Sequence, residues 1–120
     1  RGEPAVRSDE MLEQALAPVG LPVKYYEYAG TKDSYIVYNE EYEQPVDFGD
    51  NQSNSTVMWW QVHIFAPKNT DFRKHKKKAV EALKENGFVI TDIRTLYENA
   101  QQTSTIHVVI YCHMEEREEE

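Results

Sequence analysis

One unbroken β-prone segment constrains this chain more than any other: residues 56–66, Thr-Val-Met-Trp-Trp-Gln-Val-His-Ile-Phe-Ala. Pro67 follows it and predicts the end of the strand, because proline cannot donate a hydrogen bond to a strand ladder. Extended, the segment would span about 36 Å, roughly twice the length of an ordinary strand. Large apolar side chains fall on both faces. Such a strand either lies at the centre of a sheet covered on both sides or projects its first half toward a partner.

Trp59 and Trp60 stand side by side near the start of this strand, so their side chains must point to opposite faces. Two interpretations stay open for the pair. The indoles are buried in the core, or they contact a neighbouring subunit, since aromatic side chains are enriched at the centres of interfaces. Met58 belongs to the same candidate interface.

A lysine-rich helix is predicted next, from about Asp71 to Asn86, with Asn69 or Thr70 as its N-cap. Gly87 fits the left-handed position that ends a helix. Helical spacing predicts a core-facing stripe of Phe72, Lys76, Ala79, Val80 and Leu83. The opposite side carries Arg73, Lys74, Lys77 and Lys78. For these four we consider a solvated face, a salt-bridge surface against another subunit, and direct contact with DNA.

The remaining segments complete an α+β pattern. Ser8 is expected to cap a short helix over residues 9–17, and a tyrosine-rich hairpin is expected over residues 23–42. Two strands, at 88–97 and 105–113, should follow the lysine-rich helix. The predicted fold is an antiparallel or mixed sheet of about five strands with two helices packed on it, in the order α-β-β-β-α-β-β.

One domain is predicted, over residues 8–114. Residues 1–7 are expected to be a flexible segment, and residues 115–120, almost wholly glutamate, a disordered acidic tail. The polar run 44–54 is expected to be a long loop that contains Val46 and Phe48. These two side chains either pack back on the domain or insert into a neighbouring subunit.

The charge balance bears on the class of partner. The net charge of −8 argues against nucleic acid as the main partner, because phosphate binding depends on lysine and arginine. No apolar run approaches the roughly 20 residues of a membrane span, so no membrane partner is predicted. The single cysteine, Cys112, has no internal partner for a disulfide.

No catalytic constellation is visible. The chain lacks a glycine-rich phosphate loop, a nucleophile elbow and a zinc-protease motif. Cys112 and His113 are adjacent on a predicted strand and point to opposite faces, so they cannot easily share a metal ion. We therefore predict no catalytic residue, no metal site and no cofactor, and we do not expect an enzyme.

The succession of segments is similar to that of a family of phage proteins over roughly residues 8–114. The family is the small tail-terminator and head–tail joining (tail completion) proteins of long-tailed bacteriophages, particularly those of Gram-positive hosts. The resemblance rests on patterning and short phrases: Leu21-Pro22-Val23, Ser34-Tyr35-Ile36-Val37-Tyr38, Asp50-Asn51, Trp60-Gln61-Val62-His63-Ile64-Phe65 and Asn86-Gly87-Phe88. Residues 1–7 and the Trp59–Trp60 pair do not match it.

What the resemblance implies is a structural protein of the virion, assembled in the host cytoplasm. Such proteins form a ring, commonly a hexamer, that caps the tail tube and joins it to the head connector. The implied partners are further copies of the chain, the tail-tube protein and the head connector or stopper protein. DNA would pass through the ring without sequence-specific binding. The alternative is a small adaptor module that binds a protein through its basic helix face and has no part in a tail.

Overall fold

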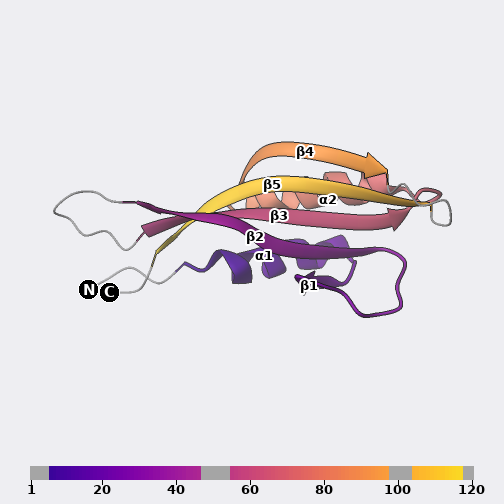
Figure 1. Cartoon of the computed structure of the whole chain (residues 1–120), viewed down its shortest axis with the longest axis horizontal. Coiled ribbons are helices and arrows are strands. Elements are labelled where there is room, and N and C mark those ends of the chain that lie inside the picture. Colours follow the sequence, from indigo (N-terminus) through magenta and orange to yellow (C-terminus); the bar gives the residue numbers. More distant parts are fainter. Residues whose placement is uncertain (1–5, 47–54, 98–103, 118–120) are drawn as a thin grey trace.

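The computed structural model describes residues 6–46, 55–97 and 104–117. Within these ranges the elements follow the predicted order (Figure 1), and the predicted α+β class is confirmed. They are α1 (Ser8–Leu16), the 3-10 turn η1 (Ala17–Val19), β1 (Val23–Tyr25), β2 (Tyr35–Val46), β3 (Ser55–Pro67), α2 (Phe72–Glu85), β4 (Val89–Tyr97) and β5 (Thr105–Arg117).

The five strands form one mixed sheet in the order β1-β2-β3-β5-β4. The long strand β3 is central, and it pairs antiparallel with β5 from Ser55↔Arg117 to Pro67↔Thr105. It also pairs antiparallel with β2, and β4 pairs antiparallel with β5. The structure combines parts of both interpretations of the segment. β3 is central in the sheet, but within the described residues helices cover only one of its faces, and its first residues extend beyond the helices.

The predicted hairpin over residues 23–42 is wrong. β1 is only three residues long and pairs parallel with β2, with Val23 opposite Ile36. Tyr26, whose φ is 72°, turns the chain out of the strand, and the connection then returns to the end of the sheet at which β1 began. There the Ile36 N–H donates to the Pro22 carbonyl at 2.8 Å. The turn-forming residues 29–33 lie in this connection and do not join antiparallel strands.

Both helices pack on the same face of the sheet and form the second layer (Figure 1). The alternation of β2, β3 and β5 directs one set of side chains into this layer, where burial of apolar surface stabilises the fold. The buried set from the strands is Ile36, Tyr38, Met58, Trp60, Val62, Ile64, Ile106, Val108, Ile110, Cys112 and Met114; Leu12, Leu16, Ala79 and Leu83 meet it from the helices.

The ends of α2 follow from local sequence. Asp71, rather than the predicted Asn69 or Thr70, is the N-cap, and its side chain accepts from the Lys74 N–H at 3.2 Å. Thr70 instead donates its hydroxyl to the Pro67 carbonyl. At the other end Gly87 has φ 92°, and the Phe88 N–H donates to the Leu83 carbonyl at 3.0 Å. The predicted left-handed glycine is confirmed.

Residues outside the expected domain limits, 8 and 114, are joined to the sheet at both ends of the domain. We expected the domain to end at Met114, but β5 continues to Arg117. The Val6 N–H donates to the Arg117 carbonyl at 2.8 Å, so the segment before α1 is also joined to the sheet. Residues 1–5 and 118–120 lie outside the described residues.

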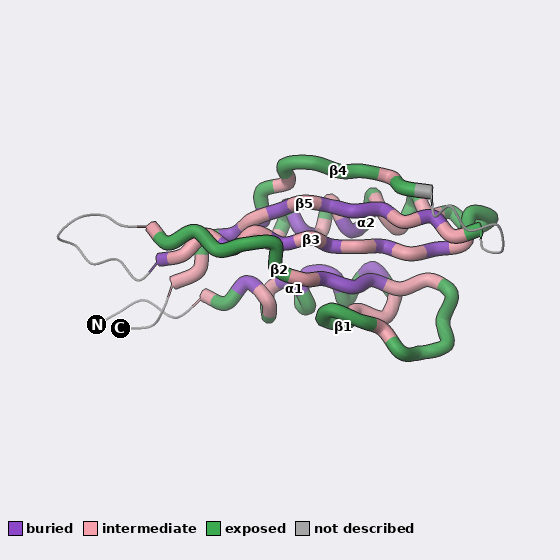
Figure 2. Tube along the Cα trace, viewed as in Figure 1, coloured by how far each residue is buried: buried purple, intermediate pink, exposed green. Residues whose placement is uncertain are grey.

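The C-terminal ends of β2 and β5 and the N-terminal end of β3 extend together beyond the helices and form an arm (Figure 1). The molecule is elongated for this reason: its longest dimension is 56 Å and its radius of gyration is 16.1 Å, against the 13–14 Å or so of a compact chain of this size. Along the arm β2 is exposed from Glu40 to Pro45, whereas β3 alternates between buried and half-buried residues (Figure 2).

Candidate functional site

The structure separates the residues of the candidate interface. Met58 and Trp60 are 7% and 3% exposed and point into the helical layer. Both are therefore unavailable for direct contact with another subunit, and the interface interpretation is wrong for them. Trp59 lies on the other face of the sheet. Val46 is half-buried at the end of β2, and Phe48 lies outside the described residues.

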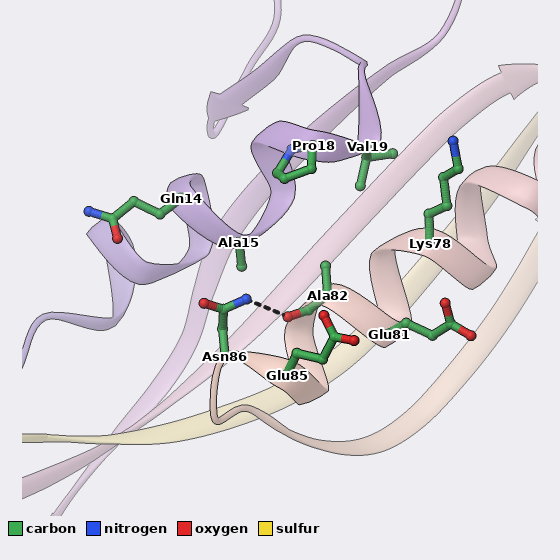
Figure 3. A pocket seen from close by; sticks show the side chains of 9 residues that line it. All are labelled: Gln14, Ala15, Pro18, Val19, Lys78, Glu81, Ala82, Glu85 and Asn86. Carbon is green, nitrogen blue, oxygen red and sulfur yellow. Dashed lines mark hydrogen bonds between the residues drawn. The ribbon is translucent and has the colours of Figure 1, made fainter.

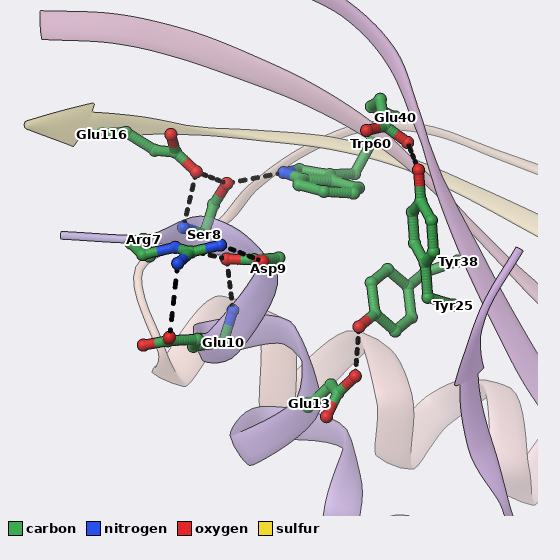
Figure 4. A network of polar contacts seen from close by, with 10 residues as sticks. All are labelled: Arg7, Ser8, Asp9, Glu10, Glu13, Tyr25, Tyr38, Glu40, Trp60 and Glu116. Carbon is green, nitrogen blue, oxygen red and sulfur yellow. Dashed lines mark hydrogen bonds and ion pairs between the residues drawn. The ribbon is translucent and has the colours of Figure 1, made fainter.

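Trp60 takes part in a polar network that fixes the start of α1 (Figure 4). Its indole N–H donates to the Ser8 hydroxyl at 2.8 Å. That hydroxyl and the Ser8 backbone N–H both donate to the carboxylate of Glu116, on β5. Ser8 is thus the first residue of the helix rather than the predicted N-cap, and Arg7 occupies the cap position. A carboxylate at this place complements the positive end of the helix dipole.

Two tyrosines of the same region donate to carboxylates (Figure 4). The hydroxyl of Tyr38 donates to Glu13 and that of Tyr25 to Glu40. Burial, together with the Glu13 carboxylate, raises the pKa of Tyr38. The Tyr38–Glu13 contact joins β2 to α1 and so links the two layers, whereas the Tyr25–Glu40 contact joins β1 to β2 within the sheet.

The sheet face opposite α1 and α2 has no helix over it within the described residues, and we call it the helix-free face. Its side chains come from the other half of the alternation of β2, β3 and β5. A column of rings crosses it: Tyr28 lies on Tyr35, Tyr35 on Phe65, and Phe65 on His107, with centroid separations of 4.5, 5.1 and 4.2 Å. Beneath the rings, Val37 is buried. The face is therefore a packed aromatic surface rather than a polar one.

A second aromatic group lies toward the arm. Trp59 stacks on Tyr42 with a centroid separation of 5.2 Å and contacts His113 at 4.2 Å. The Trp59 Nε1 atom is buried and has no hydrogen-bond partner within the part of the chain that the structure describes. A buried N–H without an acceptor carries a free-energy cost.

His63 is a titratable group on this face whose pKa is shifted by its surroundings. Its Nε2 atom lies 2.8 Å from the side-chain oxygen of Asn39 and so carries a proton. The Nδ1 atom, 2.7 Å from Nε2 of His107, then accepts from that ring. Burial, and to a lesser extent the charge of His107, lowers the pKa of His63 to about 4. His63 is therefore neutral at neutral pH, and its two ring nitrogens serve as structural contacts to Asn39 and His107.

Described residues line two hollows on the helix-free face. One, of about 380 Å³, lies over His63 between the connection after β1 and the column of rings. The other, of about 410 Å³, lies between Tyr42 and Trp59 on one side and Asp92 and Arg94, from β4, on the other. Arg94 pairs with Asp92 at 2.8 Å and lies over the Tyr111 ring, so the second hollow is partly charged.

The four predicted basic residues of α2, Arg73, Lys74, Lys77 and Lys78, are all exposed. They do not form one surface. Lys78 lines a groove of about 490 Å³ between the two helices, together with Glu81 and Glu85 (Figure 3). Arg73 and Lys77 lie on the side of α2 that faces away from this groove, given about 100° of rotation per residue. The basic run is therefore divided between two sides of the helix.

The described residues offer little for catalysis. No three His, Cys, Asp or Glu side chains among them converge as a metal ion requires. Cys112 is buried, and burial raises the pKa of its thiol to about 12, so it is not a nucleophile at neutral pH. No described helix has the length and apolar character needed to cross a membrane.

Comparison with known proteins gives a match in fold. No protein-family model and no curated protein sequence matches the chain. Among solved structures, a chain of the virion of the native gene transfer agent (GTA) particle is similar, with a TM-score of 0.51 and 14% sequence identity. The match covers 91% of this chain and 92% of that one. At this identity the likeness shows the fold alone.

Sequence reasoning missed the helix-free face as a unit. The alternation in β3 placed Trp59, His63 and Phe65 on one face, but Tyr28 and Tyr42 reach that face through a turn and a bulge. The bulge lies between Glu40 and Tyr42 and shifts the register of β2 against β3. A shift of one residue moves every later side chain to the other face, and the sequence contains no clear signal of it.

Proposed function

We propose that this protein is a structural component of a phage-like virion and, more narrowly, a tail terminator. In this role copies of the chain form a ring that caps the tail tube and provides the surface on which the head connector or stopper docks. The observation that carries the proposal is the correspondence of fold, over almost the whole of both chains, with a chain of the GTA virion. The proposed role is not catalytic.

Two features of the molecule support assembly. The helix-free face presents stacked aromatic side chains, and aromatic residues are enriched in interfaces. Trp59 is half-buried on this face, so part of its indole ring is available to a neighbouring copy. Trp59, Arg73, Lys77 and Val46 remain candidate contact residues between copies; Phe48 stays a sequence-based candidate only. Lys78 lines the groove between the helices, and Lys74 lies on the same side of α2, so neither is a candidate for this contact.

The net charge of −8 supports passage of DNA without retention. A phosphate backbone is held by lysine and arginine, and a ring of net-negative subunits lacks a general attraction for it. The proposed partners are the chain itself, the tail-tube protein and the connector, and the proposed location is the virion.

The test is to produce the chain together with the tail-tube protein encoded beside it and to examine the products by electron microscopy. We expect rings of uniform diameter, tubes capped at one end, and shorter tubes as the proportion of this protein rises. A chain that stays monomeric at high concentration and does not associate with tube protein would contradict the proposal. A monomer that instead bound an acidic protein through Lys74 and Lys77 would favour the adaptor module.

A further inference from the structure

The two edges of the sheet differ in how well they are protected. Exposed strand edges invite pairing with another chain unless charge, proline or a bulge prevents it. β4 is the last strand on one side and lacks proline and lysine. It exposes Val89, Ile93 and Leu96, by 52, 40 and 45%. The paired charges of Asp92 and Arg94 lie between these side chains, and a bulge interrupts the strand between Ile90 and Asp92. This edge therefore combines three exposed apolar side chains with a single ion pair.

The opposite edge has the reverse character. β1 covers β2 only along Ile36–Tyr38, so the edge of β2 beyond Tyr38 has no strand partner within the described residues. It carries three acids, Glu40, Glu41 and Glu43, which we call the acidic edge. Glu40 and Glu43 lie opposite Trp60 and Met58 and so point to the face on which the helices pack. Tyr42, opposite Trp59, points to the helix-free face.

A cluster of positive charge lies beside β4. α2 packs over β3, β5 and β4, with α1 on its other side (Figure 1). Since Lys78, Glu81 and Glu85 line the groove toward α1, the residues rotated away from that groove lie toward the β4 edge. These are Arg73, Lys76, Lys77 and Lys84, which we call the basic flank. None of them takes part in a salt bridge with another described residue.

We infer that the acidic edge of one copy pairs with β4 of the next, beneath the basic flank, and that the sheet thus continues from copy to copy. In a continued sheet the helices of both copies lie on one side. Glu40 and Glu43 of the incoming strand would point to that side and meet the basic flank. Tyr42 would point to the other side, where Val89 and Leu96 of β4 are exposed. The inference rests on the proposed function in that it names the contacts of the ring.

Strand direction agrees with this arrangement. β4 runs in the same direction as β3, because both are antiparallel to β5, whereas β2 runs opposite to β3. Rotation about an axis along the strands preserves direction, so β2 of the next copy would lie antiparallel to β4. The two surfaces differ, so the contact is heterologous, as a closed ring requires. Because β1 blocks part of β2, the copies must be staggered along the strands, which is also what closing a sheet requires.

Pairing of two β4 strands about a two-fold axis is the competing arrangement. It would place Asp92 of one copy opposite Arg94 of the other in a register centred on Ile93. It would also bring two basic flanks together, and that repulsion argues against it. The two arrangements respond in opposite ways to reversal of the flank.

The experiment uses two charge-reversed variants of the full chain. The first carries Lys77→Glu and Lys84→Glu in the basic flank, and the second carries Glu40→Lys and Glu43→Lys in the acidic edge. Each variant alone would place like charges next to each other at every contact between copies. We therefore expect its self-association to weaken by about tenfold or more. Mixed in equal amounts, they match opposite charges at every contact, so rings of alternating composition should form again. The four-substitution chain should also assemble alone.

The matched control is Lys74→Glu with Lys78→Glu. It makes the same change of net charge on the same helix, but on the sides away from β4, and should assemble like the unaltered chain. Thermal unfolding of each variant checks that the fold is intact. Association that is unchanged in both reversed variants would overturn the inference, and so would stronger association after reversal of the basic flank, which is the response of two-fold pairing.

The outcomes are separable from those for the proposed function. If the charge-reversed variants still form rings that cap tail tubes, this inference is wrong and the tail-terminator role still stands. If ring formation responds to the charge reversals as expected but the rings do not bind tube protein, the inference is supported and the tail-terminator role is wrong. A chain that is monomeric at concentrations on the order of 1 mM removes the inference in either case.

Discussion

Adjacent residues of one strand have different fates in this protein, and Trp59 and Trp60 show it most clearly. The pair was ambiguous in the sequence because alternation fixes only that the two indoles point to opposite faces. Which face the helices cover depends on residues far away in the sequence, such as Leu12 and Leu83. No local pattern in the sequence shows on which face of the sheet those helical residues pack. In the structure Trp60 is a core residue that stabilises the fold, and Trp59 lies on the helix-free face.

Substitution of the two tryptophans separates these roles. Trp60→Ala should lower the free energy of unfolding by about 3–5 kcal/mol, because it leaves a cavity and removes the hydrogen bond to Ser8. Trp59→Ala should lower it by about 1 kcal/mol and weaken self-association more strongly. Urea unfolding at low concentration measures the first effect, and light scattering the second. Equal losses of stability in the two variants would contradict the assignment.

His63 predicts a pH dependence of stability. Its pKa falls to about 4 in the folded chain from an ordinary value near 6.5, so the unfolded chain binds more protons between these values. The free energy of unfolding should therefore be fully retained above about pH 6.5 and decline as the pH falls toward 4. The slope from this group is at most about 1.4 kcal/mol per pH unit, reduced by its partial exposure to solvent.

The matched variant for this prediction is His63→Gln, which cannot titrate. Because carboxylates also titrate in this range, the informative quantity is the difference between the two proteins in denaturant unfolding, measured from pH 4 to pH 7. We expect the variant to lose less stability on acidification. Parallel pH profiles would show that His63 is not responsible.

At the scale of elements, the central strand and the second helix were predictable and the N-terminal strands were not. β3 and α2 carry strong local signals: unbroken alternation before Pro67, then helical spacing ended by Gly87. β1 carries three residues of weak signal, and its parallel pairing with β2 depends on the backbone of Tyr26, a residue that rarely adopts a positive φ. The extension of β5 through Glu116 depends on capping α1, a contact between residues 108 positions apart.

The two left-handed glycines provide a prediction about helix ends. Gly20 and Gly87 both have φ 92°, so alanine at either position costs about 1 kcal/mol in backbone strain. A Cβ atom at Gly87 would also lie 3.3 Å from the Cε atom of Met114, whereas one at Gly20 would meet nothing within 4 Å. Gly87→Ala should therefore destabilise more than Gly20→Ala in chemical unfolding. Equal losses would mean that Met114 adjusts without cost, and the reverse order would contradict the prediction.

The whole molecule is an elongated sheet with opposite charge at its two edges. The sequence revealed the net charge and the lysine run, but the division of α2 into a groove side and a basic flank needed the position of α1. Likewise the acids at 40–43 were predictable as edge protection, whereas the common orientation of Glu40 and Glu43 toward the helical layer follows from the bulge in β2.

This separation of charge predicts that self-association depends on salt. Contacts between exposed opposite charges are screened over about 10 Å at 0.1 M ionic strength and about 3 Å at 1 M. The dissociation constant should therefore rise as sodium chloride is increased across this range, as measured by analytical ultracentrifugation. The Lys74→Glu, Lys78→Glu control should show the same dependence. Association that strengthens with salt would indicate that the apolar surfaces dominate instead.

The bridge between Val6 and Arg117 has a consequence for the connectivity of the chain. Because the first and last described residues of the fold are hydrogen-bonded neighbours, a short peptide linker could join the two ends without disturbing either layer. New ends could then be opened between β2 and β3, where the sequence is polar. A circularly permuted chain of this kind should retain the sheet order, since order along the polypeptide is not what holds these five strands together.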